Sequence, residues 1–183
     1  MTKFVALLRG INVGGHKKIK MADLKEVAGK CGLSDVQHYV QSGNLVFSGK
    51  GTPDAVAGKL EKACERTFGF PVDIMVLSED EFRQEVAACP FADGSSPKGE
   101  LDPKFLQLAF LKGMPDSAHI EALFEAYEGP EMVRLVGRTI HIYFTEGSGR
   151  SKLTPLLTDK KLGVPATARN WNTVQKLLAM LDD

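Results

Sequence analysis

The order of elements predicted over residues 1–77 places the strongest constraint on the fold. An apolar run at 4–8 predicts a buried strand, and apolar residues at helical spacing over 22–31 predict a helix that ends at Gly32. Two strands joined by a turn follow, and then a capped helix and a last strand. Their predicted ranges are 36–40, 45–47, 52–68 and 71–77. Because the order β-α-β-β-α-β defines the split βαβ unit, we expect a ferredoxin-like first half.

The rest of the chain is predicted to repeat this order. A helix over 78–88, with Ser78 as its N-cap, and a Gly/Ser/Pro-rich stretch over 91–103 separate the two halves. The elements predicted beyond are a strand at 105–111, a helix at 116–127, a hairpin of 132–136 and 139–144, a helix at 150–161, an extended segment at 167–169 and a helix at 172–181. We therefore predict an α+β protein of two ferredoxin-like (split β-α-β) halves with an additional C-terminal helix. Its predicted parts are 1–77, a linker over 78–103, and a second α+β unit over 104–183.

A glycine-rich, basic loop follows the first strand. It reads Arg9-Gly10-Ile11-Asn12-Val13-Gly14-Gly15-His16-Lys17-Lys18. Glycines let the backbone approach a ligand and turn its N–H groups outward, and the basic side chains add positive charge, so the loop suits a phosphate. Its spacing matches neither the Gly-x-x-x-x-Gly-Lys-Ser/Thr of a Walker A loop nor the Gly-x-Gly-x-x-Gly of a dinucleotide fingerprint. The sequence thus predicts an anion site without naming the ligand.

The predicted topology brings a second segment to this loop. In a split βαβ unit the first two strands are parallel, so the loop and the turn over 41–44 should lie at one end of the sheet. The loop is also longer than most connections between a strand and a helix, as functional loops often are. The expected ligand-binding residues here are Arg9, Asn12, Gly14, Gly15, Lys17, Lys18, Gln41, Ser42 and Asn44. The alternative is structural: the glycines only turn the chain, and 42–44 is an ordinary hairpin turn.

Several motifs resemble those of a known family. They are Arg9-Gly10-Ile11-Asn12-Val13-Gly14-Gly15, then Met21 and Leu24, then Tyr39-Val40-Gln41-Ser42-Gly43-Asn44 with Phe47, and Ala168-Arg169-Asn170-Trp171-Asn172-Thr173 near the C-terminus. Together they resemble the domain of unknown function 1697 family over nearly the whole chain, as far as Leu178. The resemblance implies a small bacterial protein of α+β type. It implies no reaction, cofactor or catalytic residue.

The C-terminal motif adds two candidate binding residues. Arg169 and Asn170 precede the predicted start of the last helix, where free backbone N–H groups and the helix dipole favour negative charge. Arg169 can hold a phosphate or carboxylate, or it can pair with an acidic residue of the protein. Asn172 or Thr173 can cap the helix. Trp171 either stacks on a base or anchors the core.

Charge limits the classes of ligand. The chain has 23 basic and 23 acidic residues, and a net charge of zero argues against a non-specific polyanion binder. The distribution is uneven, because 1–50 carries eight Lys/Arg against three Asp/Glu while 78–131 carries four against twelve. This asymmetry marks either a ligand face or only the solvated faces of helices.

Hydropathy and cysteine content indicate a cytoplasmic protein that contacts no membrane. No apolar run approaches the roughly 18 residues that span a membrane, and the N-terminus carries no signal-peptide pattern. The three cysteines are widely spaced and form no Cys-x-x-Cys pair: Cys31, Cys64 and Cys89. We therefore expect reduced cysteines, no metal site and no cofactor.

The usual catalytic patterns are missing. No two histidines have the spacing of metal ligands, and Ser42-Gly43 lacks the Gly-x-Ser-x-Gly of a nucleophile elbow. His141 alternates with isoleucines in a predicted strand, so we expect it to face solvent or a partner. His16, between Gly15 and Lys17, is the histidine best placed for acid–base chemistry. The catalytic residues therefore stay unassigned.

Three hypotheses for the function remain. The first and favoured one is a module that binds an anionic ligand (a phosphorylated small molecule, a nucleotide or nucleic acid), although the aromatic motif of ferredoxin-like RNA readers is absent. The second is an enzyme acting on a phosphate- or carboxylate-bearing metabolite, in which Lys17, Lys18 or Arg9 stabilises developing charge. The third is a structural or protein-interaction module whose polar motifs serve only to hold the two halves together. The sequence leaves the oligomeric state open.

Overall fold

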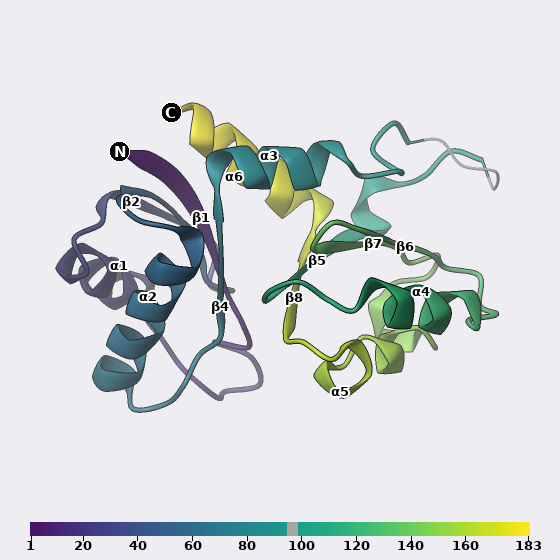
Figure 1. Cartoon of the computed structure of the whole chain (residues 1–183), viewed down its shortest axis with the longest axis horizontal. Helices are drawn as coiled ribbons and strands as arrows, with labels where there is room; N and C mark the ends of the chain where they lie inside the picture. Colours follow the sequence, from purple (N-terminus) through teal and green to yellow (C-terminus); the bar gives the residue numbers. More distant parts are fainter. Residues whose placement is uncertain (95–98) are drawn as a thin grey trace. The chain divides into compact units, whose positions relative to one another are not determined.

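The structure is a computed structural model that describes residues 1–94 and 99–183 (Figure 1). It divides into two compact units. Unit 1 consists of 1–83 together with 176–183, and unit 2 consists of 84–175. Part of the Gly/Ser/Pro-rich stretch expected at 91–103 lies outside the described residues.

Unit 1 has the predicted β-α-β-β-α-β order. Its elements are β1 (Thr2–Leu8), α1 (Met21–Lys30), β2 (Ser34–Tyr39), β3 (Asn44–Gly49), α2 (Pro53–Phe68) and β4 (Ile74–Ser78). The strands form one antiparallel sheet in the order β2-β3-β1-β4. Both β1 and β2 are antiparallel to β3, so they run in the same direction, as a split βαβ unit requires. The ferredoxin-like first half is confirmed.

Helices α1 and α2 cover one face of this sheet (Figure 1). Phe4 of β1 and Phe47 of β3 lie in the core between the sheet and these helices, with ring centroids 5.8 Å apart. Leu60 of α2 is fully buried in the same core. Strand β1 is apolar at every position from Phe4 to Leu8 because side chains on both of its faces are buried. Such a strand reads as a continuous apolar run.

Local signals set the ends of α2. The Thr52 hydroxyl accepts a hydrogen bond of 3.3 Å from the backbone N–H of Ala55, and Pro53 takes the first helical position, where its missing N–H has no consequence. Gly69 ends the helix in the left-handed conformation, with φ of 81°. The predicted start of this helix is thereby confirmed.

Unit 2 repeats the strand order of unit 1. Its elements are β5 (Leu106–Leu111), α4 (Ser117–Glu125), β6 (Met132–Val136), β7 (Thr139–Tyr143), α5 (Asp159–Leu162) and β8 (Ala166–Asn170). The sheet order β6-β7-β5-β8 corresponds to β2-β3-β1-β4, and the neighbouring strands are again antiparallel. The predicted fold of two ferredoxin-like halves is confirmed at the level of topology.

The prediction of a helix over 150–161 is wrong. The segment instead forms short 3₁₀ turns at Ser148–Arg150 and Thr154–Leu156, followed by the four-residue α5. Pro155 explains the interruption, because its ring would clash with the preceding turn of an α-helix and it lacks the N–H that the helix needs. The extended segment expected at 167–169 is longer than predicted and forms β8.

His141 is a second correction, because it is fully buried and does not face solvent. Alternation with isoleucines would expose His141 only if one face of the strand were solvated, whereas every residue of β7 is buried. Neither ring nitrogen has a hydrogen-bond partner among the described residues. Burial lowers the pKa of His141 to about 4, since the charged imidazolium is poorly solvated there.

Helices α3 (Glu79–Ala87) and α6 (Trp171–Asp182) each contain residues of both units. The start of α3 is a capping box: the Ser78 hydroxyl accepts from the N–H of Glu81 at 3.3 Å, and the Glu81 carboxylate accepts from the N–H of Ser78 at 2.8 Å. The predicted cap of this helix is thus confirmed. For α6 the cap is Asn170, whose Oδ1 accepts from the N–H of Thr173 at 2.8 Å, and not Asn172 or Thr173.

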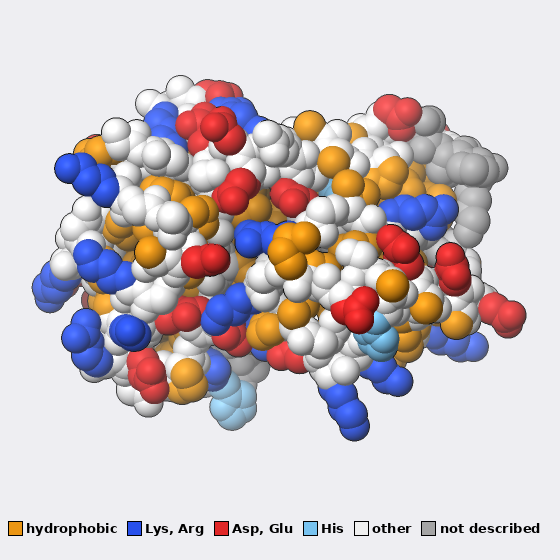
Figure 2. All heavy atoms as spheres, viewed as in Figure 1, with side chains coloured by type: hydrophobic (Ala, Val, Ile, Leu, Met, Phe, Trp, Pro, Cys, Tyr) orange, Lys and Arg blue, Asp and Glu red, His pale blue; other side chains and the backbone are white. Residues whose placement is uncertain are grey.

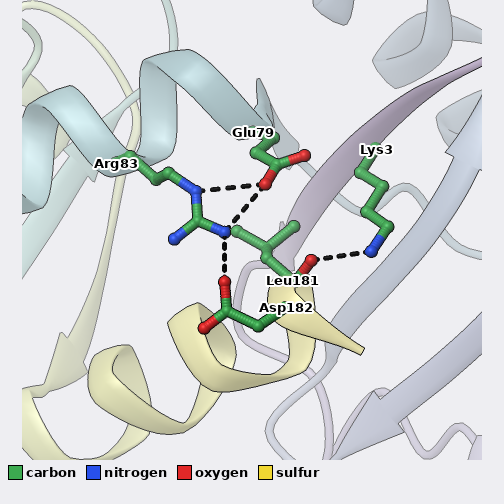
Figure 3. Close-up of polar contacts among 5 residues, drawn as sticks. All are labelled: Lys3, Glu79, Arg83, Leu181 and Asp182. Carbon is green, nitrogen blue, oxygen red and sulfur yellow. Dashed lines mark hydrogen bonds and ion pairs between the residues drawn. The ribbon is translucent and has the colours of Figure 1, made fainter.

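The last residues of the chain are tied into unit 1 (Figure 3). Arg83 donates to the carboxylates of Glu79 at 2.8 Å and Asp182 at 2.7 Å. Lys3 Nζ donates to the carbonyl oxygen of Leu181 at 2.7 Å, where a cation satisfies a free C=O at a helix end. Unit 1 is therefore completed by residues from both ends of the sequence. None of the described helices has the length and apolar character needed to cross a membrane.

Candidate functional site

The glycine-rich loop and the 41–44 turn are neighbours at one end of the unit 1 sheet. The N–H of Leu8, at the end of β1, donates to the carbonyl oxygen of Gly43 at 2.8 Å. The side chain of Asn12 donates to the carbonyl oxygen of Gln41 at 2.7 Å. The predicted proximity of the two segments is confirmed, and it follows from the parallel directions of β1 and β2.

Asn12 fastens the loop from within. Its amide group donates to the carbonyl oxygen of Ile19 at 3.0 Å and accepts from the N–H of Ile19 at 2.9 Å, in addition to its bond to Gln41. Its own N–H donates to the carbonyl oxygen of Lys17 at 3.1 Å. The side-chain donors and acceptor of Asn12, a predicted ligand-binding residue, thus bond to both the loop and the turn.

The turn packs directly against the loop. A Cβ on Gly43 would lie 2.7 Å from both the Ile11 side chain and Leu8 Cβ, and its φ of +84° also favours glycine. Asn44 is fully buried and donates to the carbonyl oxygen of Tyr39 at 2.8 Å and to the Ser42 hydroxyl at 3.1 Å. The turn is thus held by its own polar groups.

Of the four described non-glycine residues with positive φ, three lie in the loop or directly before the turn, and the fourth, Asp35, lies in β2. Asn12, Lys17 and Val40 have positive φ values of 55°, 47° and 52°, in the left-handed region that L-residues avoid. For the β-branched Val40 this conformation is the most costly, of order 1–3 kcal/mol. Strain of this kind clusters at functional sites, which makes this end of the sheet a candidate site.

A cavity of about 580 Å³ opens between the loop, the turn and the two helices of unit 1. Its walls come from four segments and include charged, polar and apolar side chains. The lining residues are Asn12, Gly15, Lys18, Ile19, Lys20, Asp23, Gln41 and Phe68. Asn12, Gly15, Lys18 and Gln41 were predicted from the sequence, and the other four were not.

Two of the missed residues follow from the topology. Asp23 lies in the first turn of α1, which the loop enters, and Phe68 is the last residue of α2. Since α2 runs back from the far end of β3, its C-terminus returns to the end of the sheet where β3 begins. The split βαβ topology, which places the loop and the turn at one end of the sheet, therefore also places Phe68 there.

Arg9 and Lys17 lie outside the cavity lining. Arg9 forms a half-exposed ion pair of 3.5 Å with Asp73. Lys17 Nζ donates to the carbonyl oxygen of Pro71 at 2.9 Å and lies 6.0 Å from the centroid of the Phe70 ring. Lys17 and Lys18 are adjacent in sequence, but only Lys18 lines the cavity, where it is joined by Lys20.

Arg169 and Asn170 belong to unit 2. Arg169 is buried on β8 and donates to the Thr167 hydroxyl at 2.8 Å and to the carbonyl oxygen of Ala168 at 2.9 Å. Burial lowers the pKa of its guanidinium to about 10. Asn170 is occupied as the cap of α6, whose first residue, Trp171, is partly buried.

The connection between β1 and α1 differs from its counterpart in unit 2. It covers 9–20 in unit 1, whereas the connection from β5 to α4 covers only 112–116. Connections between a strand and a helix usually have 2–6 residues, so the one in unit 1 is unusually long. The described residues contain no group of three or more His, Cys, Asp or Glu side chains that could hold a metal ion.

Comparison with known proteins identifies the family. Residues 1–141 match the family described as "Protein of unknown function (DUF1697)". The chain belongs to this family. The DUF1697 match includes the loop, the turn and every residue that lines the cavity, and it ends before the 168–173 motif.

A solved structure extends the likeness over the full chain. It is described as the structure of the conserved bacterial protein SP0830 from Streptococcus pneumoniae, and its sequence is 27% identical. The TM-score is 0.72, with 100% of this chain and 99% of that chain covered. No curated protein matches this chain with significance. Neither the DUF1697 description nor that of the solved structure names a ligand or a reaction.

Proposed function

We propose that this DUF1697 protein binds a small phosphorylated molecule in the cavity between the glycine-rich loop and the 41–44 turn. The observation that carries the proposal is the cavity itself, which has a volume of about 580 Å³ and is lined by both Lys18 and Lys20. Binding sites for small molecules usually have volumes of about 300–1,000 Å³ and a few convergent polar groups.

The charges of the lining favour an anion. Lys18 and Lys20 provide two ammonium groups against the single carboxylate of Asp23, so the lining has one excess positive charge. Within the described part of the chain, neither lysine has an ion-pair partner. Helix α1 also begins directly after Lys20, which adds no capping side chain, and free N–H groups at a helix start attract anions.

A small molecule fits these observations better than nucleic acid does. A nucleic-acid backbone is usually met by a continuous basic surface. On the face seen in Figure 2, lysine and arginine side chains are interspersed with aspartate and glutamate. The chain as a whole has no net charge. The charge of the cavity lining is local, which suits one phosphate group.

Calorimetric titration of the full chain with ribose 5-phosphate tests the proposal. We expect saturable binding that weakens as salt rises, because screening shortens to roughly 10 Å at 0.1 M ionic strength. At 100 times the dissociation constant the ligand should stabilise the fold by about 2.7 kcal/mol, which a melting curve detects. The double variant Lys18→Ala/Lys20→Ala should lose this binding and still fold.

Lys25→Ala is the matched control. Lys25 is exposed on α1 and does not line the cavity, so its removal lowers the net charge without changing the site. Affinity should stay within about twofold of the wild type, since surface substitutions have small effects. If Lys25→Ala weakens binding as much as the double variant does, the anion responds to overall charge and the cavity proposal fails.

A further inference from the structure

The cavity is lined by both charged and aromatic residues, and this combination restricts the chemical classes of ligand that fit it. Lys18 and Lys20 provide cations, while Phe68 provides a partly exposed aromatic ring. Ile19 also lines the cavity but is only 2% exposed. A ligand that uses the whole lining therefore carries an anionic group and a flat apolar group on one small frame.

The ring of Phe68 is held in place before any ligand binds. It packs against the core of unit 1 and stacks on Phe70, with centroids 6.4 Å apart and an interplanar angle of 26°. A preorganised ring loses little conformational freedom when a second ring packs on it. Nucleobases stack on such aromatic side chains, because every base has a π-face.

Two further groups match the polar parts of a nucleoside. The Asp23 carboxylate is an acceptor that suits sugar hydroxyl or base amino groups, and the Gln41 side chain offers both a donor and an acceptor. The backbone oxygen of Gln41 already accepts a hydrogen bond from Asn12. Asp23 also limits the positive charge of the site, which disfavours a triphosphate.

We propose that the ligand is a nucleoside monophosphate, with its base against Phe68, its phosphate at Lys18 and Lys20, and its sugar near Asp23. This inference rests on the proposed function, because it assigns the ligand class of the same cavity. It adds a role for the aromatic wall, which simple anion binding does not require.

Calorimetric titrations of the full chain with adenosine, guanosine, cytidine and uridine 5′-monophosphates, ribose 5-phosphate and adenosine 5′-triphosphate test the inference. At least one monophosphate should bind about tenfold more tightly than ribose 5-phosphate, as expected for one base–aromatic stack. If ribose 5-phosphate binds as tightly as every monophosphate, the base makes no contribution and this inference is overturned, while the proposed function stands. If none of these compounds binds, both fail. If the triphosphate binds much more tightly than the monophosphate, the assignment of a single phosphate is wrong.

A variant pair tests the aromatic wall separately. Phe68→Leu should reduce monophosphate affinity by about tenfold and leave ribose 5-phosphate affinity unchanged. Phe105→Leu, which changes a partly buried phenylalanine of unit 2, is the matched control and should alter neither affinity. Unchanged monophosphate affinity in folded Phe68→Leu overturns the inference. Should Phe68→Leu fail to fold, the titrations of the wild-type chain still decide.

Discussion

The side-chain amide of Asn12 donates a hydrogen bond of 2.7 Å to the backbone carbonyl oxygen of Gln41, and this bond ties the glycine-rich loop to the turn between β2 and β3. The other hydrogen bonds of the same amide close the loop on Ile19. One side chain thus holds together two of the four segments that line the cavity. The shape of the site depends on a residue that the sequence pattern assigned to the ligand.

Replacing Asn12 should therefore destabilise unit 1. Asn12→Ala removes three side-chain hydrogen bonds and places alanine at a φ of 55°, which asparagine tolerates better. We expect a loss of about 1–3 kcal/mol in the free energy of unfolding, measured by urea denaturation. Asn12→Gly, which relieves the backbone but also removes the hydrogen bonds, should recover part of the loss. Wild-type stability in Asn12→Ala would show that the loop does not need this fastening.

The buried His141 should make stability depend on pH. Its pKa is about 4 in the folded protein and 6.5 as a free group, so below pH 6.5 the unfolded chain binds a proton that the folded chain does not. The contribution of His141 to the free energy of unfolding is fully present above pH 6.5. It falls by up to about 1.4 kcal/mol per pH unit toward pH 4, a total loss of about 3 kcal/mol. His141→Leu should flatten this part of the profile in denaturation curves recorded at each pH.

His38→Gln is the control for that experiment, because it changes an exposed histidine of β2. Its stability profile should follow that of the wild type. The burial account of His141 is wrong if His141→Leu and the wild type lose stability in parallel between pH 6.5 and pH 4.

The last turn of α6 should stabilise unit 1 through packing more than through charge. Leu181 is only 1% exposed, and Leu181→Ala should lower the free energy of unfolding by about 2–5 kcal/mol. Asp182→Ala breaks the exposed ion pair with Arg83 seen in Figure 3 and should cost less than about 1 kcal/mol. Thermal melting of the two variants compares them directly. Equal losses, or a larger loss for Asp182→Ala, would contradict this order.

Much of unit 1 could be predicted because its signals are local. Thr52 and Pro53 mark the start of α2, and Ser78 with Glu81 marks the start of α3, each within a few residues of sequence. The incorrect predictions have nonlocal or competing causes. Pro155 breaks a segment whose apolar spacing resembles a helix. His141 alternates with isoleucines as if β7 had a solvated face, but tertiary packing buries every residue of that strand.

The candidate site was predicted in part for the same reason. Gly15 and Lys18 lie within one conspicuous loop, whereas Phe68 reaches the cavity only through the fold of α2. Sequence proximity does not decide the lining, since Lys17 and Lys18 are adjacent and only Lys18 lines the cavity. The positive φ of Lys17 and its bond to Pro71 separate the two side chains. Neither feature has a signal in the composition of the loop.

The most direct test of the central claim is an NMR titration of the ¹⁵N-labelled full chain with ribose 5-phosphate and then with adenosine 5′-monophosphate. If the cavity binds phosphorylated molecules, the backbone amide signals of Gly15, Ile19, Lys20 and Gln41 should shift in a saturable manner. In the Lys18→Ala/Lys20→Ala variant, the signals of Gly15, Ile19 and Gln41 should not shift when either compound is added. Saturable shifts confined to other parts of the chain, or no shifts with either compound, would contradict the account.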